Sequence, residues 1–540
     1  MFILAVVSAA AQEDTGGVLS GRLNAYIADG WNGLSRSLSD CKSLKDPKVT
    51  SSPVLYLPSG MAAPPAIGNL EKECNVQIRH LPRPVARLGD VSQNEIPVPG
   101  ILYLPNRYVV PGGRFNEMYG WDSYFIILGL LDDSRDDLAR GMVENFFFEI
   151  ENYGALLNAN RTYFLTRSQP PLLSSMIRAV YEHPGASPLP KEWLERAYTD
   201  AVKDHALWTS NVHAAGSTGL ARYRDVGEGP VPEMADDSSY YPDVIRWLLA
   251  HPDVHTNYLM DGPENPSAAD AEALKTTSCD VKALHVCAHA YLDGHRLTAA
   301  YFRGDRAMRE SGFDTSFRFG PFSGSTDRIA PVCLNSLLFK YELDLAHLAN
   351  LLGKSVESRR WNAAAQKRKR TVDRLLWNAG KGFYYDFNFE TGQQTGYNYL
   401  SGFYPLWAGM ATPAQAAAVR SHLPVFEYDG GLAMSDNPSG VQWDMPFGWA
   451  PEHWFAVSGL DRYGFHEDAA RISRKFMTTV RENFARDGTV REKYNVVSGS
   501  ANVQVAAGYK SNVIGFGWTN GVYLEMTRLL AAAPAADASD

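Results

Sequence analysis

The chain has 540 residues, enough for one large hydrophobic core, and 45% hydrophobic with 21% charged residues is the composition of a folded protein. Sixty acidic residues against 51 basic ones give a net charge of −9, which argues against nucleic acid as a partner. The main basic cluster, KRKR at 367–370, lies within a helical pattern, so we interpret it as a solvated helix face.

The N-terminus is an apolar run, MFILAVVSAAAQEDT, in which Ala9, Ala10 and Ala11 form an A-x-A cleavage pattern. We interpret residues 1–11 as a truncated signal peptide, because the basic residues that usually precede such a run are missing; a buried N-terminal segment is the alternative. No later apolar run reaches the roughly 18–20 residues of a membrane span. We therefore predict a periplasmic or secreted protein that has no membrane partner.

After this leader, a stretch rich in proline and glycine at 50–113 predicts an irregular arm, and we assign residues 12–113 to it. Residues 114–530 are assigned to one catalytic domain, in which helical patterns dominate. The first of these, at 132–154, opens on Asp and Ser as candidate caps and ends at Gly154. The same spacing predicts helices at 189–210, 332–353, 361–378 and 412–423, the last with Pro413 at its first helical position.

Strand-like pieces are short and local. Residues 383–394, FYYDFNFETGQQ, have a hairpin pattern, and Asp487-Gly488 is typical of a hairpin turn. We expect that such fragments cannot build a parallel sheet. The pattern favours a mostly α-helical domain with long loops, whose topology the periodicity does not supply.

The five cysteines are too few for a disulfide scaffold, and an odd number leaves at least one thiol free if the others pair within the chain. Cys41–Cys74 and Cys279–Cys287 are possible bridges in an oxidising compartment, but the connectivity stays open. His285, Cys287 and His289 are a candidate metal site, because two histidines four apart share a helix face. No acidic third ligand is near, so ordinary packing is the preferred interpretation and no metal is predicted.

Two loops carry the strongest functional signal: PGGRFNEMYGWDSYF at 111–125 and QWDMPFGWAP at 442–451. Guanidinium and carboxylate groups bind neighbouring hydroxyls, and indole rings cover the apolar C–H face of a sugar. Glycines and prolines fix the loop geometry so that these groups converge. The combination favours a sugar-binding site.

Both loops closely resemble the two signature segments of trehalases, the inverting glycoside hydrolases of family 37, and the resemblance spans roughly residues 80–530. It implies an all-α (α/α)6 barrel, two concentric rings of helices, with long loops and an irregular N-terminal arm. The implied reaction is hydrolysis of a small disaccharide, α,α-trehalose, to two glucose molecules. No cofactor is implied, and we expect a monomer.

The resemblance also assigns the reacting groups. Inverting glycosidases use one carboxyl group as general acid on the leaving oxygen and another as general base on a water molecule. RESGFDTSFRF (309–319) is similar to the trehalase segment that holds the acid, which falls on Asp314; VREKYNVV (490–497) is similar to the segment with the base, which falls on Glu492. Without the resemblance, Asp314 would be interpreted as a cap or turn residue and Glu492 as an ion-pair partner on an exposed hairpin.

The remaining matches form a sugar-binding set in which Trp449 is expected to stack on a ring and Gly312 to let a hydroxyl approach the backbone. Any single tryptophan is more often a core residue, and Asp122 alone could be a salt-bridge partner of Arg114. The substrate-binding set is Arg114, Trp121, Asp122, Asn158, Arg167, Ser168, Gln169, Glu233, Gly312, Gln442 and Trp449.

Two departures from the family pattern are clear. Val231 replaces the arginine of an Arg-Pro-Glu motif, so one cationic sugar contact is either missing or supplied elsewhere, with Arg222 and Arg224 as the candidate substitutes. In the loop at 498–514, expected to act as a lid, the usual glutamate has no counterpart and Tyr509 stands nearest to its place. Two alternatives stay open: a related (α/α)6 glucosidase for another small glucoside, such as kojibiose or glucosylglycerate, and a catalytically weak sugar-binding protein. Retention of both carboxyl groups argues against the second.

Overall fold

The inner layer of the fold is a closed ring of six helices. The computed structural model describes residues 3–44, 52–184, 187–236, 239–254, 256–262, 291–507 and 511–532. Each inner helix contacts the next, and the last packs back on the first. In order they are α4 (Asp122–Asp132), α6 (Leu173–Tyr181), α11 (Val332–Leu351), α13 (Tyr404–Trp407), α16 (Ala450–Arg462) and α18 (Gly517–Ala532).

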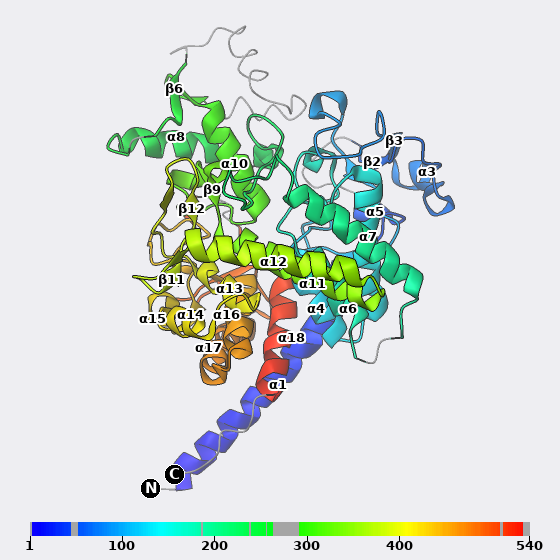
Figure 1. The fold of residues 1–540 in the computed structure, drawn as a ribbon. Coiled ribbons are helices and arrows are strands. Elements are labelled where there is room, and N and C mark those ends of the chain that lie inside the picture. The colour runs from blue at the N-terminus through cyan, green and yellow to red at the C-terminus, as the bar shows by residue number, and fades with distance from the viewer. Residues whose placement is uncertain are drawn as a thin grey trace.

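A second layer of helices surrounds this ring, so the predicted all-α (α/α)6 barrel is confirmed. The outer helix α12 lies against α11 and crosses the front of the view in Figure 1, and α17 lies against α16. The outer helices are α1 (Ile3–Leu34), α5 (Asp136–Tyr153), α7 (Lys191–Trp208), α12 (Ser355–Leu375), α14 (Pro413–Arg420) and α17 (His466–Asp487). Further helices in the connections are α2 (Cys41–Leu44), α3 (Leu70–Cys74), α8 (Tyr240–Ala250), α10 (Ala299–Ser311) and α15 (Leu423–Phe426).

Local sequence chemistry explains several helix ends. Helix α5 stops at Gly154, whose φ of +77° is readily adopted only by glycine. Helix α14 starts with a capping box, in which the Thr412 side chain accepts from the Gln415 N–H and the Gln415 side chain accepts from the Thr412 N–H. Both ends agree with the predicted boundaries. Asp487-Gly488, however, is the C-terminal cap of α17, with Gly488 at φ +71°, and the predicted hairpin turn is wrong there.

Small sheets decorate the loops, and one of them is parallel. Strand β2 pairs with both β3 and β4 in parallel, and all four of its residues are buried. The expectation that the short strands cannot build a parallel sheet is therefore wrong, because strands of two to four residues pair here across intervening segments. The strands are β2 (Val54–Leu57), β3 (Gln77–His80), β4 (Ile101–Leu102), β1 (Ser35–Arg36), β5 (Tyr108–Val109), β6 (Leu259–Asp261), β7 (Tyr291–Leu292), β8 (His295–Leu297), β9 (Ile329–Ala330), β10 (Trp377–Asn378), β11 (Phe383–Tyr384), β12 (Phe387–Asn388), β13 (Gln393–Gln394), β14 (Glu427–Tyr428), β15 (Gly431–Leu432), β16 (Phe447–Trp449) and β17 (Lys493–Asn495).

The pairing of β12 with β13 confirms the hairpin predicted within 383–394. Single turns of 3-10 helix link many of the loops. They are η1 (Pro65–Ile67), η2 (Gln93–Glu95), η3 (Thr162–Phe164), η4 (Pro232–Asp236), η7 (Pro321–Ser323), η8 (Thr326–Arg328) and η9 (Leu400–Phe403).

The first part of the expected irregular arm is helical, because α1 runs to Leu34, whereas the described residues from 35 to 113 contain only short helices, short strands and turns. Helix α1 runs through the proposed cleavage site, and its second half buries Leu23, Ile27 and Trp31 in the main core. The indole Nε1 of Trp31 donates to Asp133 at 2.6 Å, which ties α1 to the turn after α4. In the part of the chain that the structure describes, no helix is both long and apolar enough to cross a membrane. The predicted domain boundary at residue 113 stays a prediction.

The structure answers part of the question of which cysteines pair. Cys41 and Cys74 form a disulfide that joins α2 to α3, and Cys333 is a buried free thiol. The possible pair Cys279–Cys287 and the metal candidate around it lie outside the described residues. Within the described residues, no cluster of three or more His, Cys, Asp or Glu side chains could hold a metal.

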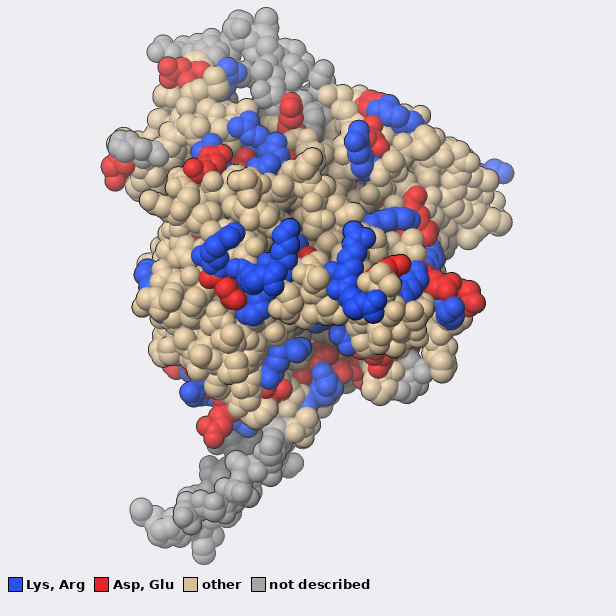
Figure 2. All heavy atoms as spheres, viewed as in Figure 1, with Lys and Arg blue, Asp and Glu red and all other residues tan. Residues whose placement is uncertain are grey.

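The basic run on α12 is only partly a solvated face. Lys and Arg side chains are prominent on the face of the molecule that α12 crosses (Figure 2), and Lys367 and Arg370 are exposed as predicted. Arg368 is buried instead, and its guanidinium Nη2 lies 2.7 Å from Glu342 of α11. The helix therefore uses one of its cations to bind the inner ring.

Candidate active site

A polar, aromatic cavity lies where the inner helices begin. Asp122 is the first residue of α4, Trp449 directly precedes α16, and Trp518 is in the first turn of α18. Both signature loops contribute to its wall. Every predicted site residue except Ser168 lines it: Arg114, Trp121, Asp122, Asn158, Arg167, Gln169, Glu233, Gly312, Asp314, Gln442, Trp449 and Glu492.

Asp314 reaches this cavity directly after α10. The helix ends at Gly312, whose φ of +80° turns the chain inward. The Asp314 side chain is 21% exposed, and its Oδ2 lies 3.5 Å from Nη1 of Arg309. Loss of hydration raises the pKa of Asp314 to about 7; Arg309 opposes this rise and Glu233 adds to it. At neutral pH this carboxyl group is therefore present in both the protonated and the ionised form.

Glu492 comes from the segment that enters β17. Strand β17 pairs with β16, which brings Lys493 opposite Trp449 and places Glu492 beside the second signature loop. The Glu492 side chain is 12% exposed, and its Oε2 lies 3.1 Å from the ammonium group of the fully buried Lys493. Its environment therefore differs from the exposed hairpin of the alternative interpretation.

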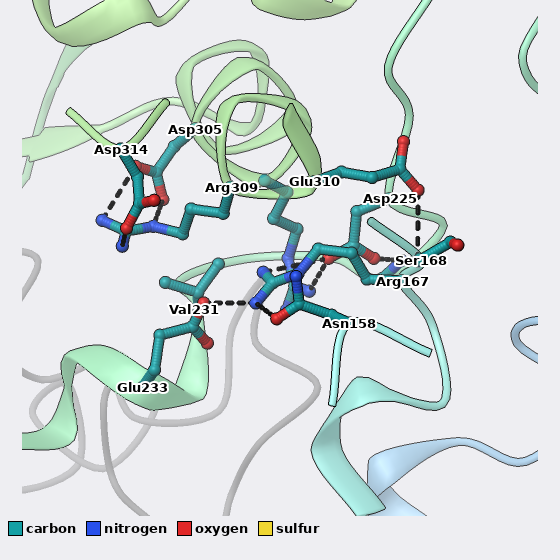
Figure 3. Close-up of polar contacts among 12 residues, drawn as sticks. Asn158, Arg167, Ser168, Asp225, Val231, Glu233, Asp305, Arg309, Glu310 and Asp314 are labelled. Carbon is teal, nitrogen blue, oxygen red and sulfur yellow. Dashed lines mark hydrogen bonds and ion pairs between the residues drawn. The ribbon is translucent and has the colours of Figure 1, made fainter. Parts of the chain in front are cut away.

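Asn158, Arg167 and Glu233 form a group of polar contacts at the cavity (Figure 3). One Nη atom of Arg167 lies 3.4 Å from Asn158 Oδ1, and the same nitrogen donates to Glu233; the other lies 3.6 Å from Asp225. Burial alone would raise the pKa of Glu233, but Arg167 and Arg309 hold it below its usual range. Glu233 is therefore ionised where Asp314 is partly protonated.

Asp122 is a third kind of carboxyl group in the same cavity. Burial raises the pKa of Asp122 well above its usual range, and the charges of Glu492 and Asp314 raise it further. The alternative pairing with Arg114 is not seen between these described residues: Arg114 Nη1 lies 3.5 Å from Ser511 Oγ. Asp122 can thus donate a hydrogen bond to a sugar oxygen as a neutral acid.

The tryptophans form a ring cluster rather than separate platforms. Trp443 stacks on Trp449 with ring centroids 3.9 Å apart, and the ammonium of Lys493 lies 5.1 Å from the centre of the Trp449 ring. Trp449 Nε1 also donates to the carbonyl of Gln442 at 2.8 Å. Trp443 therefore covers one face of the Trp449 ring, and the expected sugar stacking on Trp449 is limited to the part of the ring that Trp443 leaves open. Trp121 packs near this pair, 5.9 Å from Trp443.

Ser168 and the two expected substitute arginines lie elsewhere. The Ser168 hydroxyl donates to the Leu156 carbonyl at 2.6 Å, away from the cavity. Arg222 donates to the carbonyl of Asp327 at 2.9 Å, and Arg224 lies 3.6 Å from the carboxyl group of the same residue. The prediction that one of them replaces the missing cation is wrong. Val231 itself is fully buried, in a separate apolar cluster.

Arg309 is the cation that the sequence analysis missed. It lies in the last turn of α10, lines the cavity, and contacts Asp314 and Asp305. Its place in RESGFD was a usable signal, because it lies only five residues before Asp314 and the helix ends between them at Gly312. The wall also includes Tyr119, Phe164, Trp443 and Trp518.

The loop expected to be a lid is described at 498–507 and 511–514, and Tyr509 lies outside these residues. Its second part reaches the base: Lys493 Nζ donates to the Ser511 carbonyl at 3.3 Å, and the Asn512 side chain donates to the Lys493 carbonyl at 2.9 Å. The loop therefore supports the segment that carries Glu492.

Comparison with known proteins identifies the family. The Trehalase family model matches residues 66–247 and 251–531. A protein of Eremothecium gossypii named Probable trehalase is 34% identical over 92% of this chain and 70% of its own length. A Cytosolic neutral trehalase of Beauveria bassiana is 34% identical over 93% of this chain and 73% of its own length. Among solved structures, neutral trehalase Nth1 from Saccharomyces cerevisiae aligns with a TM-score of 0.75 and 30% identity, covering 94% of both chains.

These relatives correct one prediction. The matching proteins include ones named cytosolic, which contradicts the interpretation of residues 1–11 as a signal peptide and the expected periplasmic or secreted location. The apolar run instead begins helix α1.

Proposed function

This chain belongs to the trehalase family, and from that premise we propose that it works by inversion, with Asp314 as general acid and Glu492 as general base. Family membership makes it a glycosidase that hydrolyses α,α-trehalose to glucose. Inversion requires one carboxyl group that is protonated and one that is ionised, on opposite sides of the bond to be cut.

The observation that carries the proposal is the contrast between these two carboxyl groups in one cavity. Loss of hydration keeps the pKa of Asp314 near 7, so it holds a proton for the bridging oxygen at neutral pH. Glu492 lines the same cavity and forms an ion pair with the Lys493 ammonium at 3.1 Å, whereas Asp314 faces a guanidinium at 3.5 Å. Glu492 removes a proton from the attacking water as Asp314 protonates the departing glucose.

The surrounding polar groups hold the two glucose units. The forked guanidinium of Arg167 donates to sugar hydroxyls, the ionised Glu233 accepts from neighbouring ones, and the neutral Asp122 supplies a further donor. Arg309 provides a cation in the cavity wall, which neither Arg222 nor Arg224 reaches. The proposed substrate-binding residues are Arg114, Trp121, Asp122, Asn158, Arg167, Gln169, Glu233, Gly312, Gln442, Trp449 and Arg309.

The two roles are separable by experiment. We expect Asp314→Asn and Glu492→Gln each to lower kcat on trehalose by at least about 100-fold while far-UV circular dichroism and Tm stay close to wild type. With α-D-glucosyl fluoride, whose fluoride leaves without a proton, Asp314→Asn keeps most of its activity and Glu492→Gln does not.

The matched control is Glu427→Gln. It removes a carboxylate that pairs with Arg471 at 2.9 Å on the outer helix α17, outside the cavity, and should leave kcat unchanged. Near-normal turnover of trehalose by either active-site variant contradicts the role of that residue.

A further inference from the structure

Arg309 lies between two carboxyl groups, only one of which lines the cavity. Its Nη1 lies 3.5 Å from Asp314 Oδ2, whereas its Nη2 and Nε each lie 3.4 Å from an oxygen of Asp305. Figure 3 shows the guanidinium with Asp314 and Asp305 around it. Asp305 is one helical turn earlier on α10, is fully buried, and does not reach the cavity. It is outside the set of residues that touch the substrate.

Helix α8 fixes Asp305 from the other side. The hydroxyl of Tyr241 donates to Asp305 Oδ2 at 2.9 Å, and that of Tyr240 lies 3.4 Å from Oδ1. The Tyr240 ring also lies under the guanidinium, 5.0 Å from its centre to the carbon of Arg309. The orientation of Arg309 is therefore set by a carboxylate and an aromatic face that are both held in place.

We propose that Asp305 is a positioning residue that acts through Arg309. It competes with Asp314 for the Arg309 guanidinium, and Asp314 therefore keeps its proton at neutral pH. This inference rests on the proposed role of Asp314 as general acid. An arginine committed to one carboxylate strongly favours the ionised form of that carboxylate. A guanidinium that is shared with a second buried carboxylate still binds a sugar hydroxyl near Asp314. It stabilises the ionised form of Asp314 less, however, so Asp314 keeps its proton more readily.

The charges around Asp314 are close to balanced. Burial raises its pKa, Arg309 and Arg167 lower it, and Glu233 raises it. The charged groups that line the cavity with Asp314 are Arg309 on α10, Arg167 ahead of α6, Glu233 on η4, Asp122 on α4, Glu492 ahead of β17, and Arg114 in the first signature loop; Asp305 lies behind Arg309. Removing Asp305 from this set frees Arg309 for Asp314 and also removes a negative charge. Both effects lower the pKa of Asp314.

The test is the pH dependence of kcat/KM for Asp305→Asn, since the alkaline limb reports the pKa of the essential acid in the free enzyme. We expect the alkaline limb to move to lower pH by about one unit. The value of kcat/KM then falls about tenfold at pH values above the limb and stays near-normal at pH values below it. Asparagine keeps the size of the side chain and an acceptor for Tyr241. An unmoved limb, or a limb moved to higher pH, overturns the inference.

Two further variants separate charge from folding. Glu342→Gln removes a buried carboxylate of the same kind, which pairs with Arg368 at 2.7 Å away from the cavity, and should not move the limb. Tyr241→Phe removes a hydrogen bond from Asp305 but keeps its charge, so the limb should stay at its wild-type pH. If Asp305→Asn does not fold, the Tyr241→Phe variant still tests the inference. An alkaline limb that moves to lower pH by a full unit in this variant, which keeps the charge of Asp305, refutes the role of that charge.

Failure of this inference is distinguishable from failure of the proposed function. If Asp314→Asn abolishes turnover of trehalose and Asp305→Asn leaves the limb in place, only the role of Asp305 is wrong. If Asp314→Asn still turns over trehalose, the alkaline limb has another origin and the proposed general acid is wrong.

Discussion

Gly312 offers a sharp test of how the backbone shapes the cavity. It ends α10 at φ +80°, where an L-residue is strained, and a Cβ built there would lie 2.9 Å from Cε2 and from Cζ2 of Trp121. Trp121 is itself held by Phe313, with ring centroids 5.7 Å apart. Alanine at Gly312 therefore adds about 1–2 kcal/mol of backbone strain and about 1–3 kcal/mol of overpacking. The indole must also move by at least about 0.5 Å to restore an ordinary contact.

We expect Gly312→Ala to lower the free energy of unfolding by about 2–4 kcal/mol and kcat/KM on trehalose by about 10- to 100-fold, because Trp121 lines the cavity. Urea unfolding and steady-state kinetics measure the two effects. The matched control is Gly353→Ala, at φ +73° between α11 and α12 with open space around its Cβ. It carries the backbone strain alone and should leave kcat/KM unchanged. Equal loss of stability in both variants, with normal kinetics for Gly312→Ala, would refute the reasoning.

Three more predictions concern stability. Burial raises the pKa of Glu452 to about 8 from an ordinary value of 4.5. The folded state then binds a proton that the unfolded chain releases, so wild-type stability falls as the pH rises between these values. Glu452→Gln should thus gain a few kcal/mol over wild type at pH 8 and little near pH 4.5 in thermal unfolding; a pH-independent difference contradicts this. Val231→Arg places a charge in a fully buried apolar position, so it should lower the free energy of unfolding in urea by at least about 3 kcal/mol. It should not restore a sugar contact. A stable variant with a lower KM would contradict this prediction. Cys41→Ser removes the disulfide between residues 33 apart, which should lower the free energy of unfolding by about 3 kcal/mol. The stability of the variant should then be insensitive to reductant, and its kcat should be unchanged. Equal urea midpoints for the variant and the wild type would contradict this.

Helices were predictable where local chemistry marks their ends. The capping box at Thr412 and the left-handed Gly154 act within a few residues, so sequence alone locates them. The same local reasoning failed at Gly488, since an Asp-Gly pair suits a helix cap as well as a hairpin turn. The parallel pairing of β2 with β3 and β4 joins segments separated along the chain, and no periodicity in four-residue strands predicts such partners.

The candidate site followed from the family resemblance more than from residue chemistry. Asp314 and Glu492 are two of 60 acidic residues, and neither has a local pattern that marks it as reactive. Their different environments come from burial and from the neighbours Arg309 and Lys493, which only the fold brings into place. Arg309 was within reach of sequence reasoning, because its place in the last turn of α10 puts it beside the loop of Asp314.

The most direct test of the central claim is proton NMR of the purified protein with α,α-trehalose, recording the glucose anomers at early times. Inversion predicts equal amounts of α- and β-glucose, because one unit is attacked by water from the opposite face and the other leaves with its configuration kept. Only α-glucose would mean retention and would contradict the roles of Asp314 and Glu492. Binding of trehalose without release of glucose would contradict hydrolysis itself.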